Sequence, residues 1–266
     1  MKRPHIEQAH TLIETLIALA LAAFVMAAAV SLYRAQRSTH GASLDGIRAR
    51  DAASTALALI AQSVRMAGFV PLDASAGTAV VPVFGCTSGR PSGDSARPGC
   101  AAATADSDGL QARYIGDAVS TWPTASGQAT DCLGQGVGAP AARPLIVNRY
   151  FVRNRGGSSE PELYCEGSGR PGVAQPLVDG IERLRMRYRM RNDVAWRDAA
   201  AIAGSAWASV VAVEICVEAR GAAASGARRY VDCDGRVRAV RDGRGRRIAR
   251  QWLSLRNGMA AAGETR

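Results

Sequence analysis

Cysteine is the most reactive residue type in this sequence, because two cysteine thiols can be oxidised to a disulfide. The chain has six cysteines, an even number. No two of them have the Cys-x-x-Cys spacing of a structural zinc site, so we predict no metal site and expect disulfides formed in an oxidising compartment. Six cysteines can pair in many ways, and we favour sequence neighbours because each such pair brackets a loop rich in Gly, Pro or Asp. These pairs are Cys86 with Cys100, Cys132 with Cys165, and Cys216 with Cys233.

Histidine is scarce and occurs only near the start of the chain. The three histidines are His5, His10 and His40. The rest of the chain therefore lacks the base of a Ser-His or Cys-His catalytic pair. A Gly-x-Gly-x-Gly stretch at 134–138 has no strand before it, so it does not have the context of a dinucleotide-binding loop. We predict a protein without catalytic residues and without a cofactor.

Two short acidic motifs resemble the beginning of a calcium-binding loop. They are Asp-Ser-Asp-Gly at 106–109 and Asp-Cys-Asp-Gly at 232–235. A calcium loop of this kind continues to a glutamate at a fixed distance, and neither motif does. We therefore interpret both motifs as turns.

Arginine dominates the charge of the chain, which has a net charge of +10 and contains Lys2 as its only lysine. Within residues 181–191, apolar side chains alternate with Arg183, Arg185, Arg187, Arg189 and Arg191. Alternation with a period of two predicts a strand with the five guanidinium groups on one face. Two interpretations remain open. The favoured one is a half-buried strand with a solvated outer face, and the other is a basic ribbon for an acidic neighbouring subunit or for DNA phosphates.

The N-terminal part of the sequence contains a long apolar run. Residues 16–32 contain no charge and a single polar side chain, Ser31. Counted from Leu12 to Tyr33, the run is long enough to cross a membrane as a helix, with one carboxylate, Glu14, inside it. An acidic side chain in a bilayer costs about 2.5 to 3.5 kcal/mol even on mild scales, so Glu14 is a candidate functional residue that needs a partner.

The residues around Glu14 carry a resemblance to a known family. The string Ala9-His10-Thr11-Leu12-Ile13-Glu14, followed by an apolar helix, resembles the processing site of type IV prepilins and pseudopilins, Gly-Phe-Thr-Leu-Ile-Glu. Ala9 and His10 depart from that pattern. The resemblance implies that prepilin peptidase cuts between Ala9 and His10 and methylates the new amine of His10. It also implies that Glu14 pairs with this amine on a neighbouring subunit during assembly.

Two other interpretations of the N-terminus stay open. A secretory signal peptide has a basic start, here Lys2 and Arg3, and a small-residue cleavage site such as the one near 27–29. A plain membrane anchor is the other, because a charged residue can lie at the membrane interface. Positive charge on both sides of the span does not fix its orientation.

Further pieces resemble the PilW type of minor pilin. The helix ends in Arg65-Met-Ala-Gly68-Phe69, the corner typical of that type. The pieces that follow in the family's order lie at 108–114, 131–134, 148–152, 163–165, 176–182 and 255–257. Each piece is weak alone, but their order and the N-terminal motif together resemble PilW over nearly the whole chain.

The sequence predicts an α+β, pilin-like fold. We expect a leader at 1–9, a transmembrane half-helix at 10–33, an amphipathic half-helix at 34–69 that is loosened near 40–46 by two glycines, and a strand-rich head at 70–266. Antiparallel strands with disulfides should form the head, and residues 71–108 and 116–144 read as loops. The predicted strands are 110–115, 145–152, 181–191, 206–218 and 247–255.

These observations together predict a non-enzymatic minor pilin that joins other minor pilins to prime or cap a type IV pilus. The expected partners are prepilin peptidase, other minor pilins, the major pilin and the inner membrane, with the head in the periplasm before assembly. A pseudopilin at the fibre tip of a type II secretion system is the nearest alternative. A DNA-binding component of uptake pili is a further alternative, which we do not favour because the aromatic Tyr188 falls on the face opposite the arginines.

Overall fold

The computed structural model describes residues 11–72, 80–94, 97–103, 106–117, 120–224 and 226–257. The predicted leader and the predicted cleavage site at Ala9 and His10 lie outside these residues. The chain divides into two compact units, residues 1–44 and residues 45–266. Within the described residues, one helix is long and apolar enough to cross a membrane.

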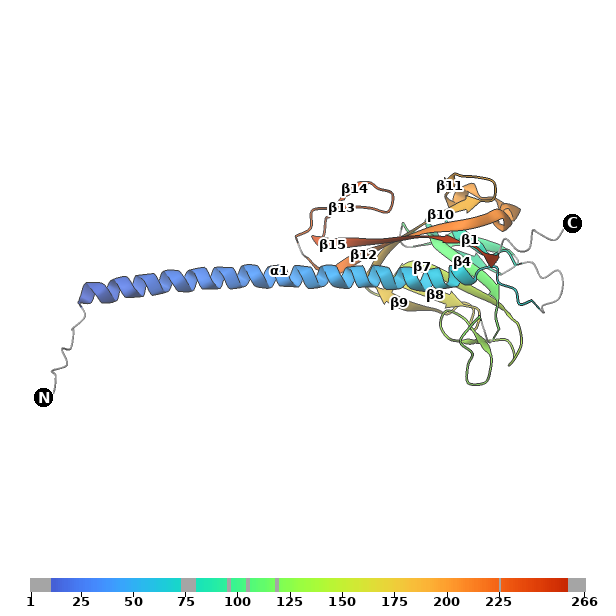
Figure 1. The fold of residues 1–266 in the computed structure, drawn as a ribbon, viewed down its shortest axis with the longest axis horizontal. Helices are drawn as coiled ribbons and strands as arrows, with labels where there is room; N and C mark the ends of the chain where they lie inside the picture. Colours follow the sequence, from blue (N-terminus) through green and yellow to red (C-terminus); the bar gives the residue numbers. More distant parts are fainter. Residues whose placement is uncertain are drawn as a thin grey trace. The chain divides into compact units, whose positions relative to one another are not determined.

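That helix is α1, Leu12–Met66, which supplies the described part of the first unit and continues into the second (Figure 1). Its apolar stretch is exposed throughout the first unit, with Leu12, Phe24 and Leu32 each more than half exposed. The predicted loosening near 40–46 is wrong, because α1 is helical through Gly41 and Gly46. Two glycines cost about 1 kcal/mol each in a helix, a cost that the long helical stretches on both sides outweigh.

The helix ends where the sequence predicts. Gly68 has a φ of 78°, a left-handed conformation that glycine adopts without strain. The backbone N–H of Gly68 donates to the carbonyl of Arg113 at 2.8 Å, so the end of the helix is joined to the neighbouring sheet. The chain is thereby turned into the β-rich head.

Two antiparallel sheets make up most of the second unit. The larger has the order β1-β4-β7-β8-β9, with strands at Val83–Cys86, Gly109–Ile115, Leu145–Asn154, Pro161–Gly167 and Ala174–Asp179. The other has the order β11-β10-β12-β15, with strands at Trp196–Arg197, Ile181–Met190, Val210–Ala224 and Arg244–Ser254. Three two-stranded ribbons complete the fold: β2 (Gly89–Gly93) with β3 (Pro98–Ala102), β5 (Ala129–Thr130) with β6 (Gly136–Val137), and β13 (Arg229–Val231) with β14 (Val237–Ala239). Short 3-10 helices lie at Ala199–Ala201 and Gly204–Ser209.

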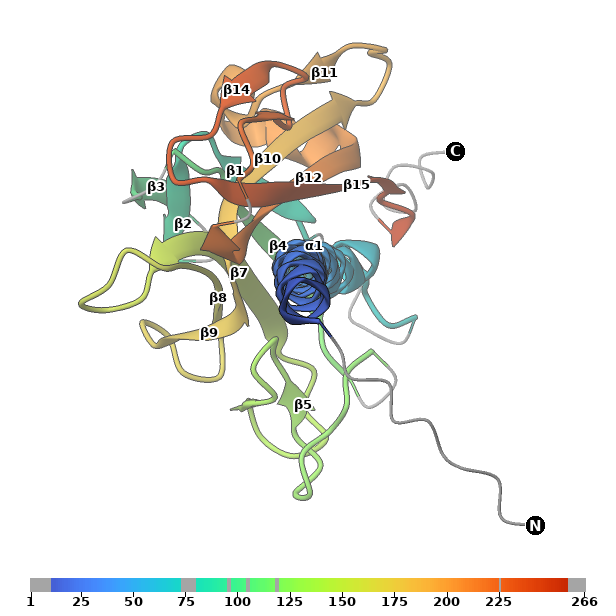
Figure 2. The same cartoon turned by 90° about the vertical axis from the view of Figure 1, so that its left-hand side faces the viewer.

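The second half of α1 packs against both larger sheets in one core (Figure 2). Alanines at 49, 53 and 56 and the larger Ile60 and Val64 are 2% exposed or less. They contact a core that includes residues from β4, β7, β8, β10, β12 and β15. The spacing of three and four along the helix explains why these residues share one face. The predicted fold of a long helix followed by antiparallel sheets with disulfides is confirmed.

Two parts of the strand prediction are wrong. Residues 71–108 were expected to form a loop, but they contain β1, β2 and β3, and 116–144 contains β5 and β6. Strands β8 and β9 were not predicted. Glycine and proline lower strand propensity locally, but β1 pairs with β4 along its whole length, and this pairing outweighs the local preference.

The six cysteines form three disulfides in the structure. They are Cys86–Cys100, Cys132–Cys165 and Cys216–Cys233, the sequence-adjacent pairs. The first joins β1 to β3, the second joins the 131–134 loop to β8, and the third joins β12 to the turn between β13 and β14. Each disulfide therefore fixes a Gly-rich or Asp-rich segment to a strand.

We expect reduction of the disulfides to destabilise the head markedly. Each disulfide lowers the conformational entropy of the unfolded state by closing a loop, and this raises the free energy of unfolding by about 3 to 4 kcal/mol. The Cys132–Cys165 loop should contribute most, since it spans 33 residues against 14 for Cys86–Cys100. Thermal unfolding of the full chain in detergent, with and without reductant, measures the total effect. The double variants Cys132→Ala/Cys165→Ala and Cys86→Ala/Cys100→Ala compare the two loops. Equal melting temperatures in oxidised and reduced protein would contradict the expectation.

Candidate functional site

The N-terminal motif forms a hydrogen-bonded cap at the start of α1. Thr11 immediately precedes the helix, and Glu14 is its third residue. The backbone N–H of Thr11 donates to Oε2 of Glu14 at 3.0 Å, and the backbone N–H of Glu14 donates to Oγ1 of Thr11 at 3.4 Å. The hydroxyl of Thr11 also donates to Oε2 at 3.2 Å. This reciprocal pattern is a capping box, which satisfies backbone donors that the first helical turn leaves without partners.

The cap gives Glu14 a role within its own chain. A carboxylate in the first turn also lies at the positive end of the helix dipole. Because a carboxylate has about four acceptor positions, the bonds from Thr11 do not exclude a further bond to an amine of another subunit. The sequence Thr-x-x-Glu is a recognisable signal for this cap, but our sequence analysis considered Glu14 only as a partner of an amine.

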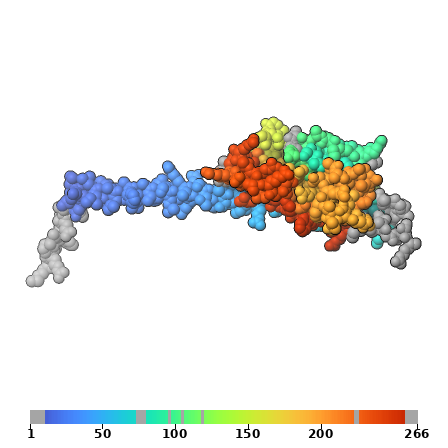
Figure 3. Space-filling model, turned by 90° about the horizontal axis from the view of Figure 1, so that it is seen from above, coloured from blue at the N-terminus to red at the C-terminus, as the bar shows by residue number. Residues whose placement is uncertain are grey.

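The arginine strand predicted at 181–191 is β10, and its arginines lie among acidic groups of the same chain. The Arg183 side chain is 12% exposed and lies 3.2 Å from Asp106 and 3.4 Å from Asp234. Arg185 lies 3.1 Å from Asp108 and 3.2 Å from Asp234. The two Asp-x-Asp-Gly segments therefore converge on these arginines from opposite ends of the sequence. The segment that contains β13, β14 and β15 lies at the surface of the head in the view of Figure 3, where it is drawn in red.

Backbone hydrogen bonds hold the carboxylates in place around the arginines. Asp108 accepts from the N–H groups of Ser88 at 3.0 Å and Met186 at 2.9 Å. Glu218 accepts from the N–H of Cys233 at 2.6 Å. Burial raises the pKa of both Asp108 and Glu218. Backbone N–H groups thus help to position these carboxylates beside the guanidinium groups.

The structure corrects both interpretations of the arginine face for Arg183 and Arg185. Their guanidinium groups are neither solvated nor available as a ribbon for phosphates, because the 106–108 and 232–234 segments cover them. Arg187 is 43% exposed and lies 3.9 Å from the carboxylate of Asp234, and Arg189 lies over the ring of Trp196. Among the described residues, no group of three or more His, Cys, Asp or Glu side chains is arranged to hold a metal ion. The two acidic motifs, which were expected to be turns only, match the arginine strand in charge, and no local sequence signal indicates this contact.

We expect Arg183→Ala to destabilise the head by about 3 to 5 kcal/mol, because among the described residues it leaves the buried carboxylate of Glu218 without a cation within 4.0 Å. Asp232 keeps Arg238 at 2.7 Å. Arg187→Ala is the matched control in the same strand, and it should change stability by about 1 kcal/mol or less because its side chain is half exposed. Chemical unfolding of the full chain in detergent measures both. Similar losses for the two variants would show that the buried network does not stabilise the fold.

Comparisons with known proteins bear on the C-terminal part of the chain most directly. Residues 149–257 match the family model of PilW, the type IV pilus-assembly protein W. No curated protein sequence matches the chain. Among solved structures, a type IV-like pilin from Thermus thermophilus is similar at 13% identity, with 78% of this chain and 95% of that chain covered and a TM-score of 0.44.

The matched residues begin in β7 and continue past the end of β15, so they include the arginine strand and the disulfide-bonded strands β8 and β12. They contain several of the pieces that resemble PilW, from the end of 148–152 to 255–257. PilW is a family of structural pilus-assembly proteins, which agrees with the prediction of a protein that is not an enzyme. The resemblance to PilW is thus confirmed, and residues 149–257 carry the sequence pattern of the type IV pilus-assembly protein W family.

Proposed function

We propose that this chain is a minor pilin that joins a complex of other minor pilins to prime or cap assembly of a type IV pilus. The PilW pattern in residues 149–257 supports a role in pilus assembly. The exposed apolar stretch of α1 supports anchoring in a membrane before assembly. The three disulfides support a head that folds in an oxidising compartment such as the periplasm.

The observation that carries the proposal is the single carboxylate at the start of the apolar stretch of α1. Glu14 lies two residues before the uncharged stretch 16–32. Its desolvation in the bilayer is unfavourable unless a partner compensates it. In the proposed assembly the partner is the α-amine of His10 on a neighbouring subunit, after prepilin peptidase has removed residues 1–9 and methylated the new amine. Pairing of two charges in a low-dielectric surrounding is strong enough to select the register between adjacent helices.

The inner membrane is the proposed location of the subunit before assembly, with one transmembrane segment and the head in the periplasm. The major pilin is then a partner of the assembled complex, and the subunit becomes part of the pilus. A fibre-tip pseudopilin of a type II secretion system would share all of these features. The match to a pilus-assembly family favours the pilus. Binding of DNA by the β10 arginines is not favoured, because Arg183 and Arg185 are paired within the chain.

We expect the mature chain to begin at His10, because the Thr-Leu-Ile-Glu register sets the cleavage position. Intact-mass spectrometry of protein extracted from membranes measures this directly, and a further mass increase of one methyl group would report the modification of the amine. A mature N-terminus near Ala29 would indicate a signal peptide instead. An intact Met1 would indicate a plain anchor.

We expect Glu14→Gln to enter the membrane and lose residues 1–9 normally, yet to co-purify poorly with other minor pilins and to reduce surface fibres. Glutamine serves as well as glutamate at this position of a capping box, so the variant removes the charge and keeps the cap. Crosslinking to the next pilin in detergent extracts measures the effect.

Thr11→Val is the matched control, because it removes the capping hydroxyl and keeps the charge of Glu14. It should be processed and should still assemble. Wild-type yields of complex and fibre from Glu14→Gln would show that the charge has no role in assembly. A defect in Thr11→Val alone would assign the motif to helix capping.

A further inference from the structure

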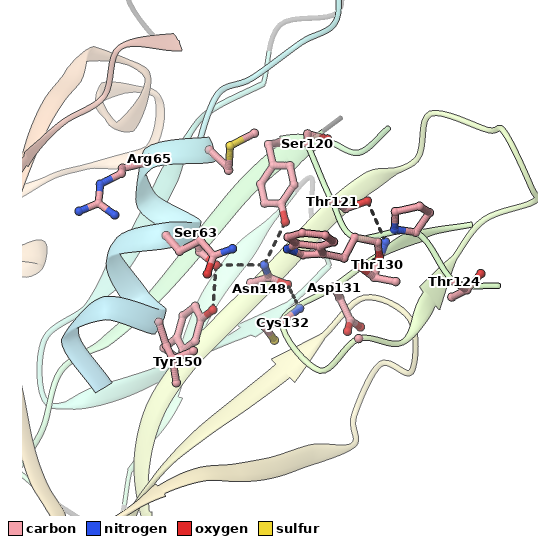
Figure 4. Close-up of a pocket in the computed structure, with 17 residues that line it drawn as sticks. Ser63, Arg65, Ser120, Thr121, Thr124, Thr130, Asp131, Cys132, Asn148 and Tyr150 are labelled. Atoms are coloured by element: carbon pink, nitrogen blue, oxygen red, sulfur yellow. Dashed lines mark hydrogen bonds between the residues drawn. The ribbon is translucent and has the colours of Figure 1, made fainter. Parts of the chain in front are cut away.

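A polar pocket lies in the head beside the end of α1. Its volume is about 810 Å³, within the range of small-molecule sites. Residues of α1, of the 120–134 segment and of β4 and β7 line it (Figure 4). Several lining residues, among them Tyr114, Asp131 and Asn148, lie in the pieces that resemble PilW.

The floor of the pocket is a buried network of hydroxyl and amide groups. Ser63 on α1 and Tyr150 on β7 share a hydrogen bond of 2.8 Å between their hydroxyls. The side-chain amide of Asn148 donates to Ser63 at 3.2 Å and to the hydroxyl of Tyr114 at 3.4 Å. Its carbonyl oxygen accepts from the N–H of Cys132 at 2.9 Å. All four network side chains are buried, and the labelled ones point toward one another in Figure 4.

Two hydroxyl protons of the network have no acceptor within hydrogen-bonding distance among the described residues. Both amide protons of Asn148 are used, and the bond between Ser63 and Tyr150 uses one of their two hydroxyl protons. The second proton of that pair and the hydroxyl proton of Tyr114 have no acceptor among the described residues. Burial raises the pKa of Tyr114 and of Tyr150, so both phenols stay protonated. A buried donor without an acceptor is unfavourable, so the floor favours an occupant with acceptor oxygens.

The charge around the floor favours a neutral occupant. Asp131 lines the pocket, and its carboxylate accepts from the N–H groups of Leu133, Gln135 and Gly169 at 2.8 to 3.1 Å. Its negative charge adds to burial in raising the pKa of both tyrosines. Arg65 on α1 also lines the pocket, so the lining carries one charge of each sign. A neutral ligand with hydroxyl or carbonyl oxygens therefore brings no uncompensated charge into the pocket.

An exposed aromatic side chain completes the pocket. Trp122 contributes to the lining and is 84% exposed. Its backbone carbonyl accepts from the hydroxyl of Thr130 at 2.6 Å, and the backbone N–H of Thr130 donates to the hydroxyl of Thr121 at 3.2 Å. The segment that carries Trp122 is thus fixed to β5. An exposed indole face beside a polar floor fits a ring that has an apolar face and hydroxyl groups at its edge.

We propose that this pocket binds a neutral saccharide, with a sugar ring on Trp122 and its oxygens as acceptors for the hydroxyls of Tyr114 and of the Ser63–Tyr150 pair. The proposal is independent of the assembly role. A pyranose supplies the acceptor oxygens that the floor lacks. It also supplies hydroxyl donors for Gln62, which lines the pocket on α1.

Binding is tested on the full chain, purified in a detergent without a sugar headgroup. The probes are N-acetyl-D-glucosamine, D-galactose and maltotriose, measured by saturation-transfer NMR and by titration calorimetry. We expect at least one probe to bind with a Kd on the order of 1 mM or tighter. Trp122→Ala should weaken that binding by about fivefold, because it removes the aromatic face on which the sugar ring lies. Tyr114→Phe removes one donor proton and keeps the ring, and it should weaken binding several-fold.

Trp252→Ala is the matched control, because Trp252 is 69% exposed on β15 and does not line the pocket. It should bind the same probe as the unmodified chain does. Melting temperatures equal to that of the unmodified chain would exclude unfolding of Trp122→Ala and Tyr114→Phe as the cause of lost binding. Failure of all three probes to bind, or equal binding by Trp122→Ala, would overturn the proposal. Protection of Trp122 from oxidation by a co-purified pilin, without any saccharide binding, would assign the pocket to a protein partner and would overturn it as well.

Discussion

Packing of the alanine-rich face of α1 against two sheets is the constraint on which the head depends. Ala49, Ala53 and Ala56 lie on one face of the helix and are 2% exposed or less. Their side chains are buried together with those of Ile60 and Val64 on the same part of the helix. Neither sheet can bury its apolar face without the helix, since a single sheet layer needs a second layer to cover it. Larger side chains at these positions would separate the sheets and strain every contact between them.

The same constraint explains the position of the polar pocket and its network. Ser63 lies on the helix near its end, one turn after Ile60, and is buried against β7. A hydroxyl in that place requires partners, and Tyr150 and Asn148 on β7 supply them. The disulfide between Cys132 and Cys165 fixes the 131–134 loop. The backbone N–H of Cys132 in this loop donates to the side-chain oxygen of Asn148. Helix, sheet and loop are thus joined by polar contacts as well as by the apolar core.

Charge in the head is arranged to be compensated internally where it is buried. Arg183 and Arg185 lie between two acidic turns that are far apart in the sequence, and the Cys216–Cys233 disulfide ties the second of these turns to β12. Exposed arginines such as Arg228, Arg229 and Arg236 lie on or beside the β13–β14 ribbon, and others, such as Arg153 and Arg170, lie elsewhere on the head. A strongly basic composition therefore does not by itself mark the arginine-rich strand as a surface for a partner. The contrast with α1 is clear, since its exposed apolar stretch carries one carboxylate at its first turn.

The sequence by itself determined the long helix, its end at Gly68, the sequence-adjacent pairs of cysteines as a preference, and the resemblance to PilW. These features depend on local signals: a continuous apolar run, a glycine in a left-handed conformation, short separations between cysteines, and ordered motifs. Only the tertiary structure decided that β1, β2 and β3 are strands, because their pairing outweighs the local effect of glycine and proline. It also decided that the arginines of β10 are covered and that Ser63, Tyr114, Asn148 and Tyr150 meet at one pocket. The arginine cluster and the pocket network both include hydrogen bonds between residues 77 to 87 positions apart in the sequence. No local sequence pattern specifies contacts of this kind.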